Sequence, residues 1–129
     1  MDRLFDRLVF DDQSPVYLQI IAFVKQAVAA GDLRQGNSIP SRRGLAAQLG
    51  VNPMTVQRAY KQMEDEGLIR TLPNAGSVIS VSERERRAVH DELVRDEVGQ
   101  FVRRMKRMRL PFKDVIDLVS DLWDEEALP

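Results

Sequence analysis

Residues 39–60 read IPSRRGLAAQLGVNPMTVQRAY, and this stretch decides the fold because it encodes two short helices around a sharp turn. Ser41 is a good N-cap for the first helix, and Gly50 ends it because glycine adopts the left-handed conformation without a side-chain clash. Asn52 can cap the second helix, whose first residue, Pro53, has a φ that already suits a helix. Two helix starts and one stop in so short a stretch predict a helix-turn-helix.

The second of these helices has an apolar side and a polar side. Val56, Ala59, Tyr60 and Met63 recur at helical spacing, so we expect them to face the core. The candidates for the opposite, exposed side are Met54, Thr55, Gln57, Arg58 and Lys61. An exposed helix that carries such donors fits the major groove of double-stranded DNA, which is the partner that the segment predicts.

The first helix begins with two cations, Arg42 and Arg43. A cation at a helix N-terminus opposes the helix dipole unless an anion lies nearby, and DNA phosphate is such an anion. We therefore predict DNA contacts from both motif helices and from a loop at residues 72–76. The predicted contact residues are Arg42, Arg43, Asn52, Met54, Thr55, Gln57, Arg58, Lys61, Asn74 and Gly76.

Segments on both sides of the motif complete a winged helix. Before it, Ser14 and Pro15 begin a supporting helix with an apolar stripe that ends at Gly31. After it, residues 68–71 and 77–81 are typical of two strands. The predicted fold is therefore mainly α with a small β-hairpin, a winged helix-turn-helix domain over residues 10–81.

The loop between the two strands is the predicted tip of the wing. Its residues Asn74 and Gly76 are the types that best tolerate a positive φ, and Pro73 fixes the direction of the chain. Such a tip can approach the DNA backbone closely.

From Ser82 onward the pattern changes to a two-helix tail, residues 82–129. Ser82 and Glu85 form a capping box that opens a long helix to about Arg109, and a second helix follows over residues 112–123. Two such amphipathic helices cannot bury both apolar faces alone, so we expect a homodimer through this tail. The predicted dimerisation residues are Val98, Phe101, Val102, Met105, Val115, Ile116, Val119, Leu122 and Trp123.

Composition excludes several classes of protein. A chain of 129 residues with 43% hydrophobic residues has room for one small domain and an appendage. The absence of cysteine excludes disulfides and thiolate metal sites and agrees with a cytoplasmic location. Because residues 1–6 mix acids with apolar side chains, we expect no secretory signal there, and no apolar run reaches membrane-spanning length.

The net charge of −1 hides an uneven distribution. Residues 34–81 hold six basic and three acidic side chains, whereas residues 113–129 hold one basic and six acidic ones. A local basic surface on the winged helix is therefore compatible with the near-neutral total. A second basic run, residues 103–109, is typical of a solvated helix face or of pairing with the acids of residues 121–126, and its contact with DNA stays open.

We find no sequence pattern that supports catalysis, a metal or a cofactor. The chain has no Gly-rich phosphate loop and no nucleophile–base pair, and its single histidine, His90, has only sequence neighbours as candidate co-ligands. We expect no enzyme activity and no cofactor. The sequence leaves open whether a small-molecule effector binds between the tail helices.

Four tracts, in this order, resemble the GntR family of bacterial transcription regulators, and the short tail is similar to that of its YtrA-like subfamily. The tracts are PVYLQI at 15–20, IPSRRxLA at 39–46, VNPxTVxxAY at 51–60 and EGLI at 66–69. The resemblance implies a homodimeric repressor that binds an inverted-repeat operator, often near genes for an ABC transporter. It also implies operator contacts at Arg43, Thr55 and Gln57 and a wing-tip role for Gly76.

This chain departs from the family pattern at two places. Many relatives have arginine in the early recognition helix, where this chain has Pro53, Met54 and Gln57, and the first wing glycine is replaced by Asn74. The alternative function is a winged-helix module for protein–protein interaction, because a fold does not fix a function. The salt dependence of DNA affinity separates the two hypotheses.

Overall fold

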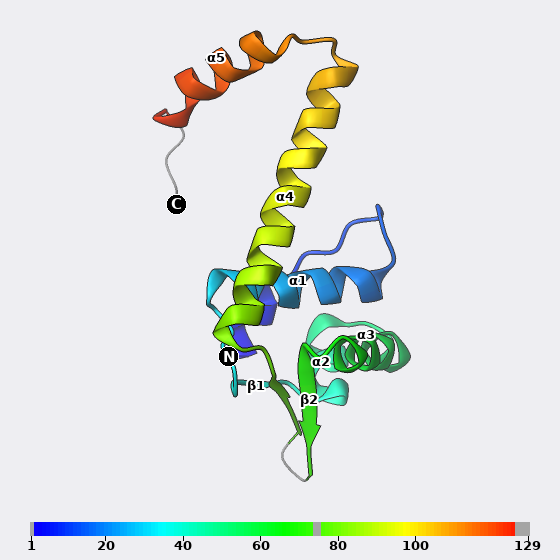
Figure 1. The fold of residues 1–129 in the computed structure, drawn as a ribbon. Helices are drawn as coiled ribbons and strands as arrows, with labels where there is room; N and C mark the ends of the chain where they lie inside the picture. Colours follow the sequence, from blue (N-terminus) through cyan, green and yellow to red (C-terminus); the bar gives the residue numbers. More distant parts are fainter. Residues whose placement is uncertain (1, 74–75, 126–129) are drawn as a thin grey trace. The chain divides into compact units, whose positions relative to one another are not determined.

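The computed structural model describes residues 2–73 and 76–125 (Figure 1). The chain divides into two compact units, Met1–Asp91 and Glu92–Pro129. The helix α4 begins in the first unit and ends in the second.

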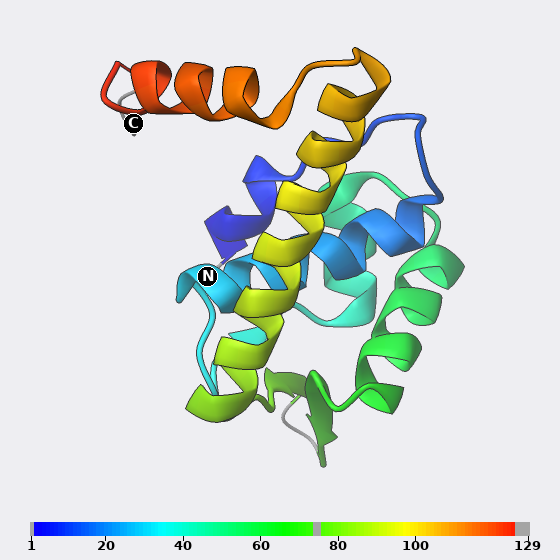
Figure 2. The same cartoon turned by 45° about the horizontal axis from the view of Figure 1, so that its top comes forward.

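Three helices build the first unit: α1 (Val16–Ala30), α2 (Arg42–Leu49) and α3 (Pro53–Asp65). Both α1 and α2 pack against α3, and Figure 2 gives a second view of the three. The apolar stripes predicted from the sequence form the core, which includes Ile20, Val24, Leu45, Val56, Ala59, Tyr60 and Met63. The predicted end of the supporting helix is confirmed, since Gly31 caps α1 in the left-handed conformation with φ of 83°.

A short 3-10 helix at the start of the chain, η1 (Asp2–Arg7), was not predicted from the sequence. It contributes Phe5, which is 1% exposed, to the core of the first unit. The ring of Phe5 lies 5.4 Å from that of Phe23 in α1, centroid to centroid. Residues that precede the predicted domain therefore complete its core.

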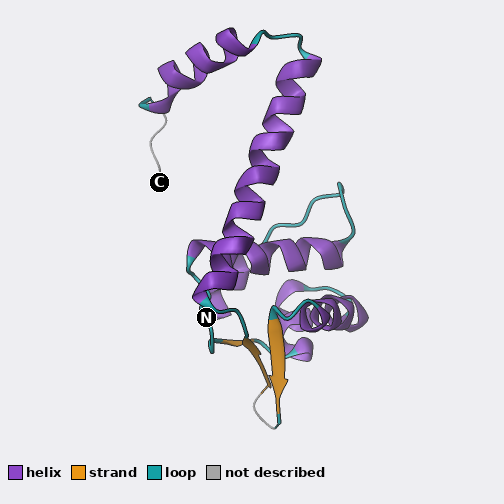
Figure 3. Ribbon diagram, in the orientation of Figure 1, coloured by secondary structure: helices purple, strands orange, loops and turns teal. Residues whose placement is uncertain are grey.

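A small antiparallel sheet follows the helices, with strands β1 (Ser38–Ile39), β2 (Ile69–Leu72) and β3 (Gly76–Ile79) (Figure 3). The predicted hairpin is the β2–β3 pair, in which Ile69 faces Ile79. The strand β1, which lies between α1 and α2 in the sequence, adds to the other edge of β3, so that Ile39 pairs with Ser77. The wing is thus anchored to the segment that leads into α2.

The tail consists of α4 (Glu83–Arg107) and α5 (Phe112–Trp123). The predicted capping box is present, because Ser82 Oγ accepts from Glu85 N and Glu85 Oε1 accepts from Ser82 N, both at 3.2 Å. These bonds hold the pKa of the Glu85 carboxyl below its ordinary value. After α4 the chain turns through Arg109, whose φ of 60° is in the left-handed region, and Leu110 N donates to Met105 O.

Candidate nucleic-acid interface

The helix-turn-helix is held by the caps that the sequence predicts. Ser41 Oγ accepts a 3.0 Å hydrogen bond from Gly44 N at the start of α2, and Gly50 ends the helix with φ of 67°. Asn52 Oδ1 accepts a 2.8 Å bond from Met54 N at the start of α3. Because these bonds satisfy helix-end donors locally, the turn between the helices has a defined geometry.

The helix α3 presents one of its sides to the solvent. Val56, Ala59, Tyr60 and Met63 are fully buried on its inner side. On the outer side Met54 is 72% exposed, Gln57, Arg58 and Lys61 are also exposed, and Thr55 is half-buried. All five candidates named from the sequence therefore lie away from the core, as a recognition surface requires.

Two of the outer cations are oriented by neighbours within the protein. The guanidinium carbon of Arg58 lies 3.9 Å from the ring centroid of Tyr17 in α1, close enough for a cation–π contact. Lys61 Nζ lies 3.2 Å from Asp65 Oδ1 one helical turn away, in an exposed pair that contributes little to stability. Both charges stay at the surface, where phosphate can compete for them.

The two cations at the start of α2 have different surroundings. Arg43 is exposed, and its side chain has no hydrogen bond or ion pair within residues 2–73 and 76–125. Arg42 is turned toward α3, where its Nη2 lies 2.9 Å from Glu64 Oε1 and its guanidinium lies 5.5 Å from the ring centroid of Tyr60. For Arg42, therefore, the carboxylate of Glu64 supplies the anion that we expected from DNA phosphate.

The wing carries a glycine in the conformation expected at its tip. Gly76 has φ of 72°, and a Cβ built on it would meet nothing within 4 Å. The predicted contact at Asn74 lies outside the described residues. Arg70 on β2 is exposed and adds a cation to the wing. Arg70 was not among the predicted contact residues, although the alternation of side chains along a strand indicates that it points outward.

The second unit contains an apolar groove of about 660 Å³ between α4 and α5. Neither helix has a buried residue in the part of the tail that the structure describes. The groove is lined by most of the predicted dimerisation residues, namely Val98, Phe101, Val102, Met105, Val115, Ile116, Val119 and Trp123. Leu122 is 47% exposed and does not line it. The protomer alone therefore leaves this surface in water, which is unfavourable for side chains of this kind.

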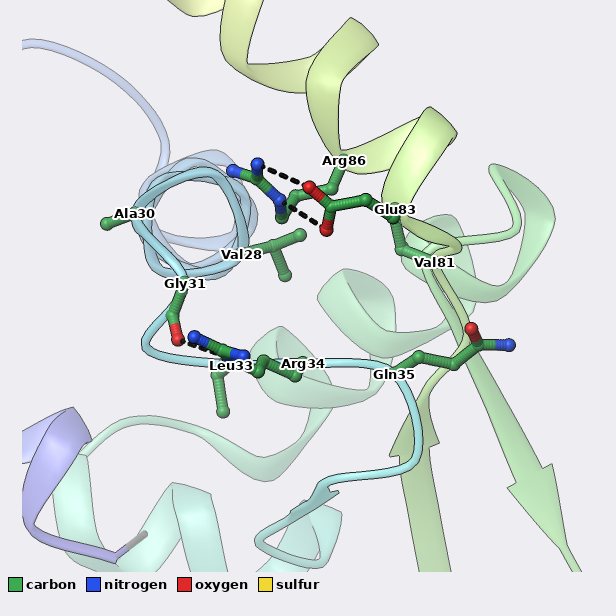
Figure 4. A pocket seen from close by; sticks show the side chains of 9 residues that line it. All are labelled: Val28, Ala30, Gly31, Leu33, Arg34, Gln35, Val81, Glu83 and Arg86. Atoms are coloured by element: carbon green, nitrogen blue, oxygen red, sulfur yellow. Dashed lines mark hydrogen bonds and ion pairs between the residues drawn. The ribbon is translucent and has the colours of Figure 1, made fainter.

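A separate pocket of about 580 Å³ lies in the first unit, near the end of α1 and the first turn of α4 (Figure 4). Arg86 borders it and binds Glu83 through two bonds of 2.7 and 2.9 Å, while its Nη1 donates to Ala29 O at 2.7 Å. The bonds from Arg86 hold the pKa of the Glu83 carboxyl below its ordinary value. The Arg86 contacts attach the first turn of α4 to the end of α1.

Two other kinds of site have no candidate among the described residues, a metal centre and a membrane span. Within residues 2–73 and 76–125 no three His, Cys, Asp or Glu side chains gather as a metal site would require. No described helix combines the length and apolar character that crossing a bilayer requires. The interface on α2, α3 and the wing is therefore the candidate site that this part of the chain supports best.

The fold and the exposed recognition surface define a winged helix-turn-helix DNA-binding regulator. The chain belongs to the GntR family, since the model for bacterial regulatory proteins of the gntR family matches residues 16–79. Its similarity to YtrA proteins places it within the YtrA-like subfamily. It is 32% identical over 108 residues to the uncharacterized HTH-type transcriptional regulator YhcF of Bacillus subtilis, covering 84% of this chain and 89% of that one.

Two further similarities agree with this assignment. The HTH-type transcriptional repressor YtrA of B. subtilis is 43% identical over 67 residues, which are 52% of each chain. The structure of a GntR family transcriptional regulator from Listeria monocytogenes has a TM-score of 0.78 at 28% identity, and the match covers 87% of this chain and 98% of that one. These relatives are transcription regulators and not enzymes.

Proposed function

We propose that this protein is a cytoplasmic, homodimeric repressor that binds an inverted-repeat operator with α3 of each copy in the major groove. The proposal rests on one observation: α3 has one buried, apolar side and one exposed, polar side. Four of its side chains are fully buried, while its polar and cationic side chains face the solvent at a capped, rigid N-terminal end. A helix held in this way can present donors to base edges at defined positions.

The proposed DNA contacts divide into two kinds. Arg43 and Gln57 have the donors to read base edges, and Met54 offers apolar contact to a thymine methyl group. The other residues are proposed to bind the sugar–phosphate backbone: Asn52, Thr55, Arg58 and Lys61 from the helix-turn-helix, and Asn74 and Gly76 from the wing tip. Arg42 is left out of both groups because Glu64 binds it.

We propose that the tail of a second copy of this chain covers the apolar groove between α4 and α5. Pairing two tails about a two-fold axis would remove the exposed faces of Phe101, Ile116 and Trp123 from water. It would also hold two recognition helices one DNA turn apart, roughly 34 Å, which matches an inverted repeat. Leu122 would then join the interface from the rim of the groove.

A repressor role is supported by the name of the YtrA relative in B. subtilis, a transcriptional repressor. Binding over a promoter would exclude the polymerase, and we propose genes for an ABC transporter among the targets. Footprinting of the DNA upstream of the neighbouring genes tests this part. Protection of an inverted repeat next to transporter genes is expected, and protection elsewhere would contradict the target assignment.

The central experiment is selection of duplexes from a random pool by the full-length protein, followed by fluorescence anisotropy at several salt concentrations. We expect enrichment of an inverted repeat and an affinity that falls steeply with salt, with a slope of about −0.9 per phosphate contact. A protein–protein interaction module would enrich no sequence. Flat salt dependence without enrichment would therefore overturn the proposal.

A further inference from the structure

We propose that Glu64 is a positioning residue for DNA recognition. It joins α2, α3 and the wing, and discrimination between the operator and other DNA depends on these connections. Glu64 itself does not contact DNA. The inference rests on the proposed DNA-binding function. It concerns a residue near the C-terminal end of α3, outside the set that is proposed to bind DNA.

The first connection runs from Glu64 to α2. Glu64 Oε1 lies 2.9 Å from Arg42 Nη2, and the two side chains are only 29% and 32% exposed. The Arg42 guanidinium also lies over the ring of Tyr60, and its Nε is buried without a hydrogen-bond partner among the described residues. Arg42 is therefore held against α3, whereas its neighbour Arg43 is exposed.

The second connection runs from Glu64 to the wing. Thr71 Oγ1, on β2, donates to the same oxygen, Glu64 Oε1. Thr71 Oγ1 also lies 3.3 Å from Ser77 Oγ on β3, and Ser77 is 4% exposed. Since Thr71 and Ser77 are direct partners in the β2–β3 ladder, the carboxylate of Glu64 is linked to both strands of the wing.

One carboxylate oxygen thus fixes two elements relative to the recognition helix. A hydrogen bond to a charged acceptor is stronger than one between neutral groups; the Arg42 contact is partly buried, and the Thr71 contact is exposed. Loss of the Glu64 carboxylate therefore allows α2 and the wing to shift. Contacts to phosphate tolerate a small shift because they depend mainly on charge. Contacts to base edges do not, because bidentate pairing requires both distance and direction. The loss of Glu64 should therefore reduce specificity more than general DNA affinity.

The experiment uses the full-length protein and two probes: the best duplex that the unmodified protein selects from a random pool, and a scrambled duplex of the same base composition. Glu64→Gln keeps the shape of the side chain and removes its charge. The control, Glu66→Gln, removes an equal charge at the C-cap of α3, where Glu66 Oε2 lies 3.7 Å from Lys25 Nζ. We expect Glu64→Gln to lower the ratio of specific to nonspecific affinity by about tenfold, as for members of one hydrogen-bonded network. Glu66→Gln should leave the ratio unchanged.

A second pair of variants examines the wing connection. Thr71→Val removes the hydroxyl that binds Glu64 and keeps the branched shape, while Thr71→Ser keeps the hydroxyl. We expect the affinity ratio to fall in Thr71→Val and to remain in Thr71→Ser. Arg42→Gln should lower the ratio as well, and combining it with Glu64→Gln should add little because the two residues act through one contact.

Three results would overturn the inference: an unchanged ratio in Glu64→Gln, equal losses on both probes, or fully additive effects of Arg42→Gln and Glu64→Gln. All affinities are measured well below the melting temperature of each variant, so that unfolding does not enter the ratio. Failure of the proposed function is a different outcome, because then the unmodified protein itself would not distinguish the two probes.

Discussion

The hydroxyl of Tyr60 in α3 donates a 2.6 Å hydrogen bond to the carbonyl oxygen of Pro40, the residue before the N-cap of α2. The side chain of Tyr60 is fully buried, so this bond ties the recognition helix to the start of its partner helix inside the domain. Together with apolar packing and the Arg42–Glu64 pair, this hydrogen bond between residues 20 positions apart sets the angle between the two helices of the motif.

Tyr60→Phe is expected to lower the free energy of unfolding by about 1–2 kcal/mol, because the Pro40 carbonyl loses its donor in a poorly hydrated place. Tyr17→Phe is the control, since no hydrogen bond joins the Tyr17 hydroxyl to the described residues and its ring under Arg58 is kept. Urea denaturation followed by circular dichroism measures both. Equal stability of Tyr60→Phe and the unmodified protein would show that water replaces the bond.

Tyr60 also makes stability depend on alkaline pH. Burial raises the pKa of Tyr60 above its ordinary value, and the nearby charge of Arg42 opposes this with a smaller effect. The unfolded chain then releases the proton at a lower pH than the folded protein, so this contribution is complete below about pH 10 and is lost as pH rises above it. Between pH 10 and 11 the unmodified protein should lose stability more steeply than Tyr60→Phe, and parallel curves would contradict the assignment.

Arg43→Ala is expected to weaken operator binding and to relax discrimination at one base pair in each half-site. A bidentate contact between arginine and guanine is worth roughly 1–3 kcal/mol, and the exposed side chain has no structural partner to lose. Arg84→Ala, which removes an equally exposed arginine from α4, is the control. Anisotropy on the selected duplex and its single-base variants measures the effect. Equal loss on specific and random duplex would show that Arg43 binds phosphate only.

Gly76→Val is expected to reduce DNA affinity more than stability. A branched residue disfavours the positive φ of this position, so the wing tip would adopt another conformation, although nothing collides with the new side chain. Gly31→Val is the matched control, because Gly31 also has positive φ, 83°, at the end of α1. Both variants should lose similar stability, and only Gly76→Val should lose affinity. Wild-type affinity in Gly76→Val would mean that the wing does not approach DNA.

Ile116→Glu is expected to convert the proposed dimer to a monomer and to abolish the gain in affinity from the second half-site. A charge in the apolar groove of the tail would be buried without a partner in the dimer. Leu118→Glu is the control, because Leu118 is similarly exposed at 52% on the same helix but does not line the groove. Sedimentation equilibrium and gel shifts measure both variants. A dimeric Ile116→Glu, or a monomeric Leu118→Glu, would place the interface elsewhere.

The sequence by itself determined the features that act over a few residues. Ser41, Asn52 and Ser82 each cap a helix through a donor two or three residues away, so their residue types reveal the helix starts directly. Gly50 ends α2 through its own backbone freedom. Helical periodicity likewise identified the buried side of α3 and most of the groove-lining positions of the tail, because the spacing of apolar residues is a local property of the helix.

The tertiary structure alone decided the contacts between distant residues. Arg42 binds Glu64 at a separation of 22 residues, and β1 pairs with β3 although three elements lie between them in the sequence. Phe5, in a segment without a sequence signal, completes the core. From the residue type alone one can infer that an arginine needs an anion or that a phenylalanine prefers burial. Which partner it has depends on which surfaces the packed helices bring within a few ångströms of each other.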